Sequence, residues 1–235
     1  MILRPLQPAP RGSEEYLAAW PVVERIEKQK YDSCWLITQP SHAALAAELA
    51  ARLSAPQFPK PDPQMIQAIA LHDAGWGVPD AHSVQKSRSS GRYHPESFLD
   101  MPASQLVSIW QDSIDTAKSA SAAGGYAVSR HFDRIARQRI ATGSDSPQER
   151  RKLESFVSAE TQRQKKLAAK QPLSIEELER LADLLQFVDL LSLYFCSGAS
   201  ENVIFPEYFG LRVQILNKPE GFRFTPQIFE QGTQW

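Results

Sequence analysis

Three histidines and two aspartates carry most of the chemical information in this sequence. They are His42, the adjacent pair His72 and Asp73, His131 and Asp189. Imidazole nitrogens and carboxylate oxygens together suit divalent first-row ions such as Fe, Mn, Ni or Zn. Each of these residues taken alone is more often structural than functional, so the set as a whole must carry the argument.

Asp189 is the hardest of the five to explain as a purely structural residue. Its helical neighbours include Leu185, Val188 and Leu193, which place it in an apolar environment. A buried carboxylate without a partner is costly, so a metal ion, a cationic side chain or hydrogen bonds must offset the loss of solvation. A buried arginine or lysine partner is therefore the alternative to a metal.

The order of these residues along the chain resembles a known pattern. Members of the HD-domain superfamily, which includes metal-dependent phosphohydrolases, carry a His, then a His-Asp pair, and then an Asp. His42, His72, Asp73 and Asp189 fill these four positions. The neighbouring sequence also resembles DUF3891, a bacterial family of unknown function within that superfamily, over most of the chain. The segments that carry this second resemblance are 37–43, 70–76, 126–132 and 189–193.

The resemblance implies an all-helical core that binds one or two divalent ions of Fe, Mn, Ni or Zn. His42, His72, Asp73 and Asp189 would bind the first ion, and Asp73 would be free to bridge to a second. His131 matches, in order and helical setting, a ligand of that second ion or a proton donor. Two ions about 3.5 to 4 Å apart would clamp a phosphate or an oxygen substrate.

The sequence also departs from its hydrolytic relatives near the His-Asp pair. Several of them place Glu or Lys four residues after the motif histidine, where this chain has Trp76. Trp76 is instead a candidate for the wall of a substrate pocket. Asp80 is a candidate acid or base, although Asp is common in turns such as the one expected beside Pro79. His94 is a weaker candidate ligand than His131.

Cationic side chains supply candidates for binding a phosphate. They are Lys86, Arg88, Arg92 and Arg130. The first three lie in a polar stretch without periodicity, which predicts a loop over 78–101 and a candidate lid; their alternative role is ordinary solvated charge. Arg130 lies on a predicted helix, where it supplies an anion site or pairs with Asp133 or another acid.

Hydrophobic spacing predicts a mainly α fold, an HD-domain-like helical bundle with one or more short N-terminal strands and a small C-terminal β-hairpin. A Gly124–Gly125 break is expected between two helices, and Ser41 is expected to cap the helix that bears His42. A capping box at Ser174 starts the best-formed helix, which ends near Tyr194. The other predicted helices cover 16–30, 43–53, 64–72, 102–120, 126–140 and 147–170, and the predicted strand covers 34–38.

Length and composition indicate one domain in the 235 residues. We divide it into an N-terminal extension (1–40), a helical metal-binding core (41–197) and a β-rich tail (202–235). Twenty-six basic and 27 acidic residues give a net charge of −1, which argues against stable nucleic-acid binding. Two cysteines exclude a disulfide framework and a four-cysteine zinc site, and indicate a reducing compartment. With no signal peptide or membrane span recognised, we expect a cytoplasmic protein.

These observations favour a metal-dependent phosphohydrolase that acts on a small phosphorylated substrate, either a phosphate ester or a nucleotide. One alternative is an HD-type dinuclear iron oxygenase, which the missing Glu or Lys leaves open. The other is a non-enzymatic module that binds a metal or a ligand. The sequence does not determine the substrate, the metal or the oligomeric state.

Overall fold

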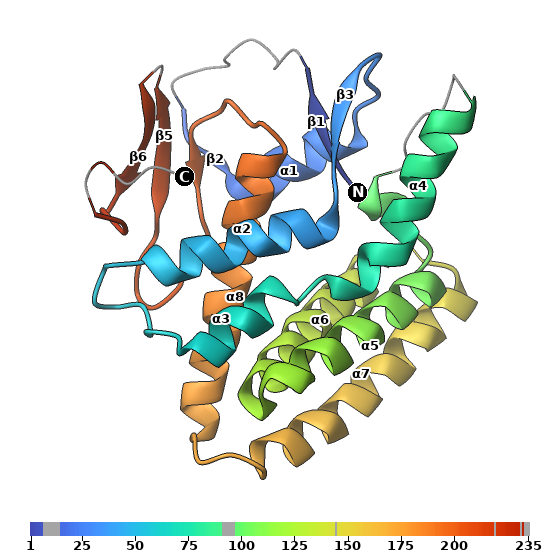
Figure 1. Cartoon of the computed structure of the whole chain (residues 1–235), viewed down its shortest axis with the longest axis vertical. Coiled ribbons are helices and arrows are strands. Elements are labelled where there is room, and N and C mark those ends of the chain that lie inside the picture. The colour runs from blue at the N-terminus through green and yellow to red at the C-terminus, as the bar shows by residue number, and fades with distance from the viewer. Residues whose placement is uncertain (7–14, 91–96, 144, 219, 231, 233–235) are drawn as a thin grey trace.

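The computed structural model of the chain describes residues 1–6, 15–90, 97–143, 145–218, 220–230 and 232. Helices dominate it, and the short strands lie at one end of the molecule (Figure 1). The expectation of a mainly α fold with N-terminal strands and a small C-terminal sheet is confirmed. In chain order the elements are β1 (Ile2–Pro5), β2 (Leu17–Ala18), α1 (Ala19–Lys28), β3 (Cys34–Ile37), α2 (Gln39–Arg52), α3 (Pro63–Ala70), η1 (Ala74–Trp76), α4 (Gly77–Ser90), η2 (Phe98–Asp100), α5 (Ala103–Ala120), α6 (Ala122–Thr142), α7 (Pro147–Ala168), α8 (Ile175–Cys196), β4 (Val203–Ile204), β5 (Gln214–Lys218) and β6 (Gly221–Thr225).

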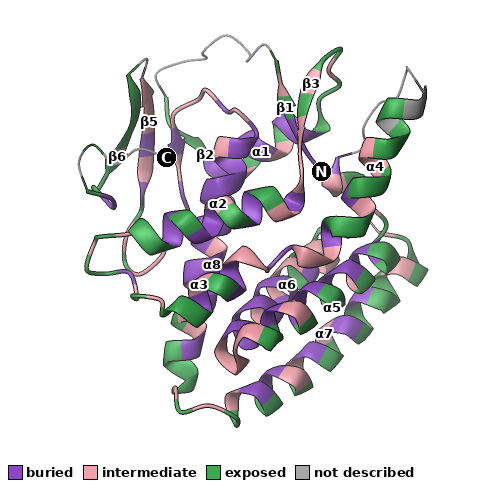
Figure 2. Cartoon of the chain, viewed as in Figure 1, coloured by how far each residue is buried: buried purple, intermediate pink, exposed green. Residues whose placement is uncertain are grey.

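Helix α8 is the central element of the core. Its middle, from Phe187 to Tyr194, is buried at every position, as expected of a helix that is covered on all sides. Helix α2 crosses it on one side and α6 packs on another, while α5 and α7 cover α6 (Figures 1 and 2). The predicted capping box is present, since Ser174 and Glu177 exchange side-chain and backbone hydrogen bonds at the start of the helix.

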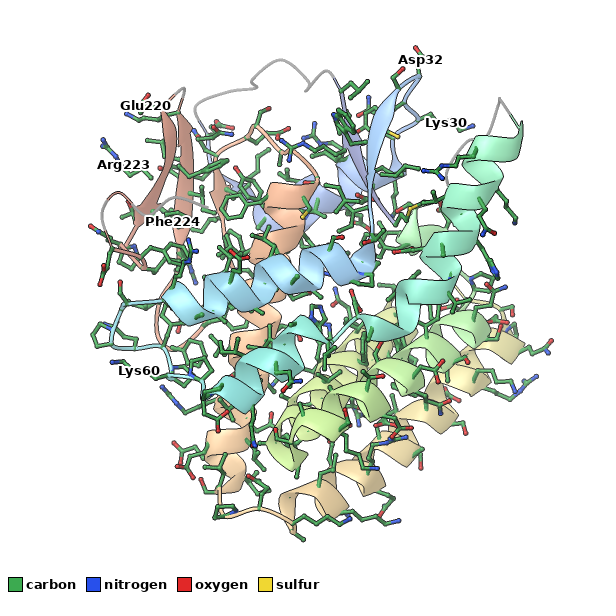
Figure 3. All side chains as sticks on the ribbon, in the orientation of Figure 1. Lys30, Asp32, Lys60, Glu220, Arg223 and Phe224 are labelled. Carbon is green, nitrogen blue, oxygen red and sulfur yellow. The ribbon has the colours of Figure 1, made fainter. Side chains whose placement is uncertain are left out.

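Two small sheets flank the helices. β1 pairs antiparallel with β3, and β2, β4, β5 and β6 form a four-stranded sheet in that order. The predicted C-terminal hairpin is formed by β5 and β6, which pair antiparallel from Gln214 with Thr225 to Lys218 with Gly221. Figure 3 shows Arg223 pointing away from the molecule, whereas Phe224 contacts the ring of Phe229.

The predicted loop over 78–101 is wrong for its first half, because α4 runs through it to Ser90. The helix projects from the rest of the molecule (Figure 1), and most of its described side chains are exposed (Figure 2). A projecting helix needs no apolar stripe, so the periodicity that identifies a packed helix is missing. Among the residues of α4 whose exposure is described, the buried one is Asp80, near the start of the helix.

The predicted break at Gly124 is also wrong, because both glycines lie inside α6. The break falls at Ser121, whose hydroxyl accepts a hydrogen bond from the Gly124 N–H and caps α6. A Cβ on Gly124 would overlap the side chain of Ala68 on α3, so this glycine permits a close approach of two helices rather than a turn.

The helix that bears His42 begins earlier than expected. Thr38, not Ser41, is its N-cap and accepts a hydrogen bond from the Ser41 N–H. Pro40 lies inside the first turn, where the lack of an N–H is no disadvantage. Pro40 therefore lies in the first turn of α2, while β3 has already ended at Ile37.

A buried carboxylate joins three segments of the chain. Glu27 of α1 is 2% exposed; its Oε1 accepts a hydrogen bond from the Leu3 N–H of β1, and its Oε2 accepts one from the Ser97 hydroxyl. Burial raises the pKa of Glu27 to about 7, although both hydrogen bonds oppose the rise.

None of the helices in the described parts of the chain is both long and apolar enough to cross a membrane.

We expect Glu27→Gln to remove a pH dependence of stability. The pKa of Glu27 is raised from 4.5 to about 7, so its contribution is complete below about 4.5 and is lost as the pH rises through 7. The free energy of unfolding of the wild type, relative to the variant, should therefore fall across this window in urea denaturation. A difference between the two proteins that is constant with pH would contradict the assignment.

Candidate metal centre

Four side chains from three places in the fold meet beside the middle of α8. His42 comes from the first turn of α2, His72 and Asp73 follow the end of α3, and Asp189 comes from α8. All four residues are buried, with relative exposures of 7% or less. The structure thus brings together the four residues that the sequence pattern selects.

The turn after α3 positions the His-Asp pair. The Nδ1–H of His72 donates a hydrogen bond of 2.7 Å to the carbonyl oxygen of Ile69, since a carbonyl oxygen can only accept. The other ring nitrogen, Nε2, is therefore directed away from α3 and lies 3.1 Å from Asp189 Oδ1. Asp73 begins the η1 turn, in which the Gly75 N–H donates to the hydroxyl of Ser113 on α5.

The Nε2 atoms of the two histidines face the same carboxylates. His42 Nε2 lies 2.8 Å from Asp73 Oδ2 and 3.7 Å from Asp189 Oδ1. His72 Nε2 lies 3.1 Å from Asp189 Oδ1 and 3.7 Å from Asp73 Oδ2. Each imidazole is thus within reach of both aspartates.

These separations fit a first-row ion. Ligands about 2.1 Å from an ion lie about 3.0 Å apart when adjacent in an octahedron and about 3.4 Å apart in a tetrahedron. The four nitrogen–oxygen distances, from 2.8 to 3.7 Å, bracket these values. The ligand atoms of His42, His72 and Asp189 all lie within 4.8 Å of one another, so this group could hold a metal ion.

When no metal is bound, a proton on His72 offsets part of the negative charge of the two aspartates. Burial alone would lower the pKa of His72, but Asp73 and the hydrogen bond to Asp189 outweigh it and raise the pKa to about 9. Burial would raise the pKa of Asp189, but His72, His131 and His42 lower it to about 2. The metal-free site therefore holds an imidazolium between two carboxylates, which is the position a cation would take.

His131 lies next to this group without joining it. It is 2% exposed on α6, and its Nε2 is 4.0 Å from Asp189 Oδ2, the oxygen that does not face His72. Burial lowers the pKa of His131 to about 4, in spite of the nearby carboxylates, so the ring is neutral at pH 7. Its Nδ1 is buried without a hydrogen-bond partner among the described residues.

The carboxylates form the side of the site that solvent can reach. The side chains of Asp73 and Asp189 are 9% and 11% exposed, against 1% for His42 and 0% for His72. The small exposed part of the site therefore lies on the aspartate side, and the imidazoles are shielded from solvent.

Asp80 is held by backbone groups rather than facing a cleft. It lies in α4, not in the expected turn; its Oδ2 accepts a hydrogen bond of 2.7 Å from the Gln39 N–H, and its Oδ1 lies 3.2 Å from the amino group of Met1. Burial raises the pKa of Asp80, against both of these partners. Trp76, four residues earlier, is 3% exposed and packs in the hydrophobic core.

The candidate anion-binding residues are dispersed. Lys86 and Arg88 are exposed on α4, and Arg92 lies outside the described residues, as does His94. Arg130 pairs with Asp133 at 2.7 Å and with Glu179 at 2.9 Å, which is the pairing that its sequence context left open.

Ser192 also contacts the site, and it is not among the candidate residues predicted from the sequence. It is fully buried on α8, and its hydroxyl lies 2.8 Å from His42 Nδ1. The available signal was its position three residues after Asp189, which places both side chains on the same face of α8.

The sequence profile of one protein family matches residues 26–233, a span that includes the four candidate metal ligands and Ser192. The family is described as a protein of unknown function, DUF3891. The chain belongs to this family. No curated protein and no solved structure matches the chain. The DUF3891 match therefore assigns the chain to a family but gives it no activity.

We expect Gly75→Ala to disrupt the site through the η1 turn. A Cβ at this position would overlap the backbone carbonyl oxygen of Ile109 on α5, so the turn that bears Asp73 must shift. The free energy of unfolding should fall by about 1 to 3 kcal/mol, measured by urea denaturation. The control is Gly77→Ala, where a Cβ meets nothing within 4 Å. Equal stabilities of the two variants would argue against this packing constraint.

We also expect the metal-free protein to lose stability between about pH 6.5 and pH 9. The folded pKa of His72, about 9, lies above its ordinary value of 6.5, so its stabilisation is complete below 6.5 and lost by about 9. Zn²⁺ affinity should rise over the same window, because the ion must displace this proton. Urea denaturation and zinc titration at several pH values check both effects. His72→Gln is the control, and a wild type with the same pH profile as this variant would refute the assignment.

Proposed function

We propose that the chain is a metal-dependent phosphohydrolase that acts on a phosphate ester or a nucleotide. The observation that carries the proposal is the convergence of His42 Nε2, His72 Nε2, Asp73 Oδ2 and Asp189 Oδ1 at spacings that suit one divalent ion. The resemblance to the HD-domain superfamily supplies the class of reaction. Membership of DUF3891 is compatible with it and adds no activity of its own.

The donor set limits which ions fit. Two imidazole nitrogens and two carboxylate oxygens, without a thiolate, suit Fe, Mn, Ni or Zn. A divalent ion bound here would supply Lewis acidity and lower the pKa of a coordinated water. The solvent-facing aspartate side is where this water and a small phosphorylated substrate would enter.

Nearby residues have separate roles in this proposal. His131 is neutral at pH 7, which favours a ligand or a proton acceptor at Nε2 over the role of proton donor. Lys86 and Arg88, which are exposed on α4, and Arg130, which pairs with Asp133 and Glu179, remain the candidates for phosphate recognition. Asp80, bonded to the N–H of Gln39, is better placed to fix the start of α2 than to transfer protons.

One observation supports a second ion, which both a two-metal hydrolase and the alternative, a dinuclear iron oxygenase, would use. The two oxygens of Asp189 face different imidazoles, Oδ1 towards His72 and Oδ2 towards His131. A carboxylate in this position could bridge two ions, with His131 as a ligand of the second. Two bound irons and no phosphatase activity would favour the oxygenase over the hydrolase.

We expect the purified protein to contain about one or two equivalents of Fe, Mn, Ni or Zn by elemental analysis. His72→Ala and Asp73→Ala should lose this metal, and both should lose hydrolysis in a screen of phosphate esters and nucleotides. His82→Ala, which changes an exposed histidine of α4, should keep both. A wild type that binds no divalent ion after reconstitution would overturn the proposal. Metal without turnover would leave a non-enzymatic metal-binding module.

A further inference from the structure

Ser192 has a single hydroxyl proton and two hydrogen-bonding neighbours. Its Oγ lies 2.8 Å from the carbonyl oxygen of Asp189 and 2.8 Å from Nδ1 of His42. A carbonyl oxygen can only accept, so the hydroxyl proton is directed to Asp189. The second bond must then run the other way, with the Nδ1–H of His42 donating to Ser192 Oγ.

This direction fixes which nitrogen of His42 is available to a metal. A neutral imidazole carries one proton, and a proton on Nδ1 leaves the lone pair on Nε2. Nε2 is the atom that faces Asp73 and Asp189. In the metal-free protein the 2.8 Å contact with Asp73 Oδ2 requires a proton between the two atoms, and an ion bound at Nε2 would displace that proton and leave the one on Nδ1 in place. Because Ser192 is fully buried, solvent does not compete for the Nδ1 proton.

We propose that Ser192 is a positioning residue for the metal site, which sets the tautomer and orientation of His42. The inference rests on the proposed function, since it concerns a ligand of the proposed ion. Helix α8 then contributes twice to the site: Asp189 is a ligand, and the hydroxyl one turn later orients a ligand from α2. Such hydrogen-bond partners of metal-binding histidines typically change metal affinity by 10- to 100-fold when removed.

The two histidines are oriented by different kinds of acceptor. The Nδ1–H of His72 donates to a main-chain carbonyl oxygen, that of Ile69, which no substitution removes. His42 depends on a side chain instead. Its orientation can therefore be tested by mutation without changing any proposed ligand.

Ser197 provides a matched control on the same helix end. It is also fully buried, and its hydroxyl donates to the carbonyl oxygen three residues earlier, that of Tyr194, at 3.0 Å. Ser192 makes the same bond to Asp189. The two serines differ in the contact with His42, so a comparison of their variants isolates that contact.

The experiment is a calorimetric titration of the full metal-free chain with Zn²⁺. We expect Ser192→Ala to weaken binding by about 10- to 100-fold, and Ser197→Ala to leave it within about twofold of the wild type. Ser192→Thr keeps the hydroxyl and should restore most of the affinity, with Ser197→Thr as the control for the added methyl group. Thermal unfolding of the metal-free proteins checks that both alanine variants fold.

The outcomes separate the two proposals. If the wild type binds Zn²⁺ and Ser192→Ala binds it as Ser197→Ala does, the role of Ser192 is refuted and the metal site stands. If Ser192→Ala is weakened and Ser192→Thr is no better, the hydroxyl is not the cause, and the inference is also refuted. If the wild type binds no Zn²⁺ or other divalent ion, the proposed function fails, and the inference fails with it.

Discussion

Two buried carboxylates that share the same neighbours need a positive charge between them. Asp73 and Asp189 each lie within 4 Å of the Nε2 atoms of both His42 and His72, in a region where the imidazoles are almost wholly shielded from water. In the metal-free protein a proton on His72 supplies this charge, as its raised pKa indicates. The packing of α2, α3 and α8 meets this requirement. Helix α2 and helix α8 each carry one of the four side chains, and the turn after α3 carries the other two.

Much of this arrangement could be predicted from the sequence where the pattern involves residues close together in the chain. The spacing of the motif selected four side chains that the fold brings together, and the capping box at Ser174 correctly predicted the start of α8. Local signals were misleading where tertiary packing determines the choice of residue. Gly124 is typical of a helix break, yet it lies inside α6, where the missing side chain allows α3 to pack closely. Helix α4 was missed for the opposite reason, since a helix that packs against little needs no periodic apolar face.

The hydrogen-bond partners of Ser192 and Asp80 could not have been assigned from the sequence, because they come from distant segments. Ser192 bonds a histidine 150 residues away, and Asp80 bonds the backbone of Gln39, 41 residues away. Neighbouring residues of one helix also differ in what they meet. Arg130 is partly exposed and pairs with the carboxylates of Asp133 and Glu179, while His131 is buried beside Asp189. Periodicity indicates that adjacent side chains face different ways, but only the fold shows what each one meets.

The proposed ligands lie far apart along the chain, before and after the residues that form most of the helical core. An ion bound by them would therefore close a long loop of the chain. The contact between His72 and Asp189 closes a loop of 117 residues, and the only two cysteines of the chain are both free. An ion coordinated by these residues would act as a removable cross-link, restricting the unfolded chain much as a disulfide does but without thiol chemistry. The lifetime of the folded state would then depend on the rate at which the ion is released, so that a chelator would act on this protein as a denaturant does.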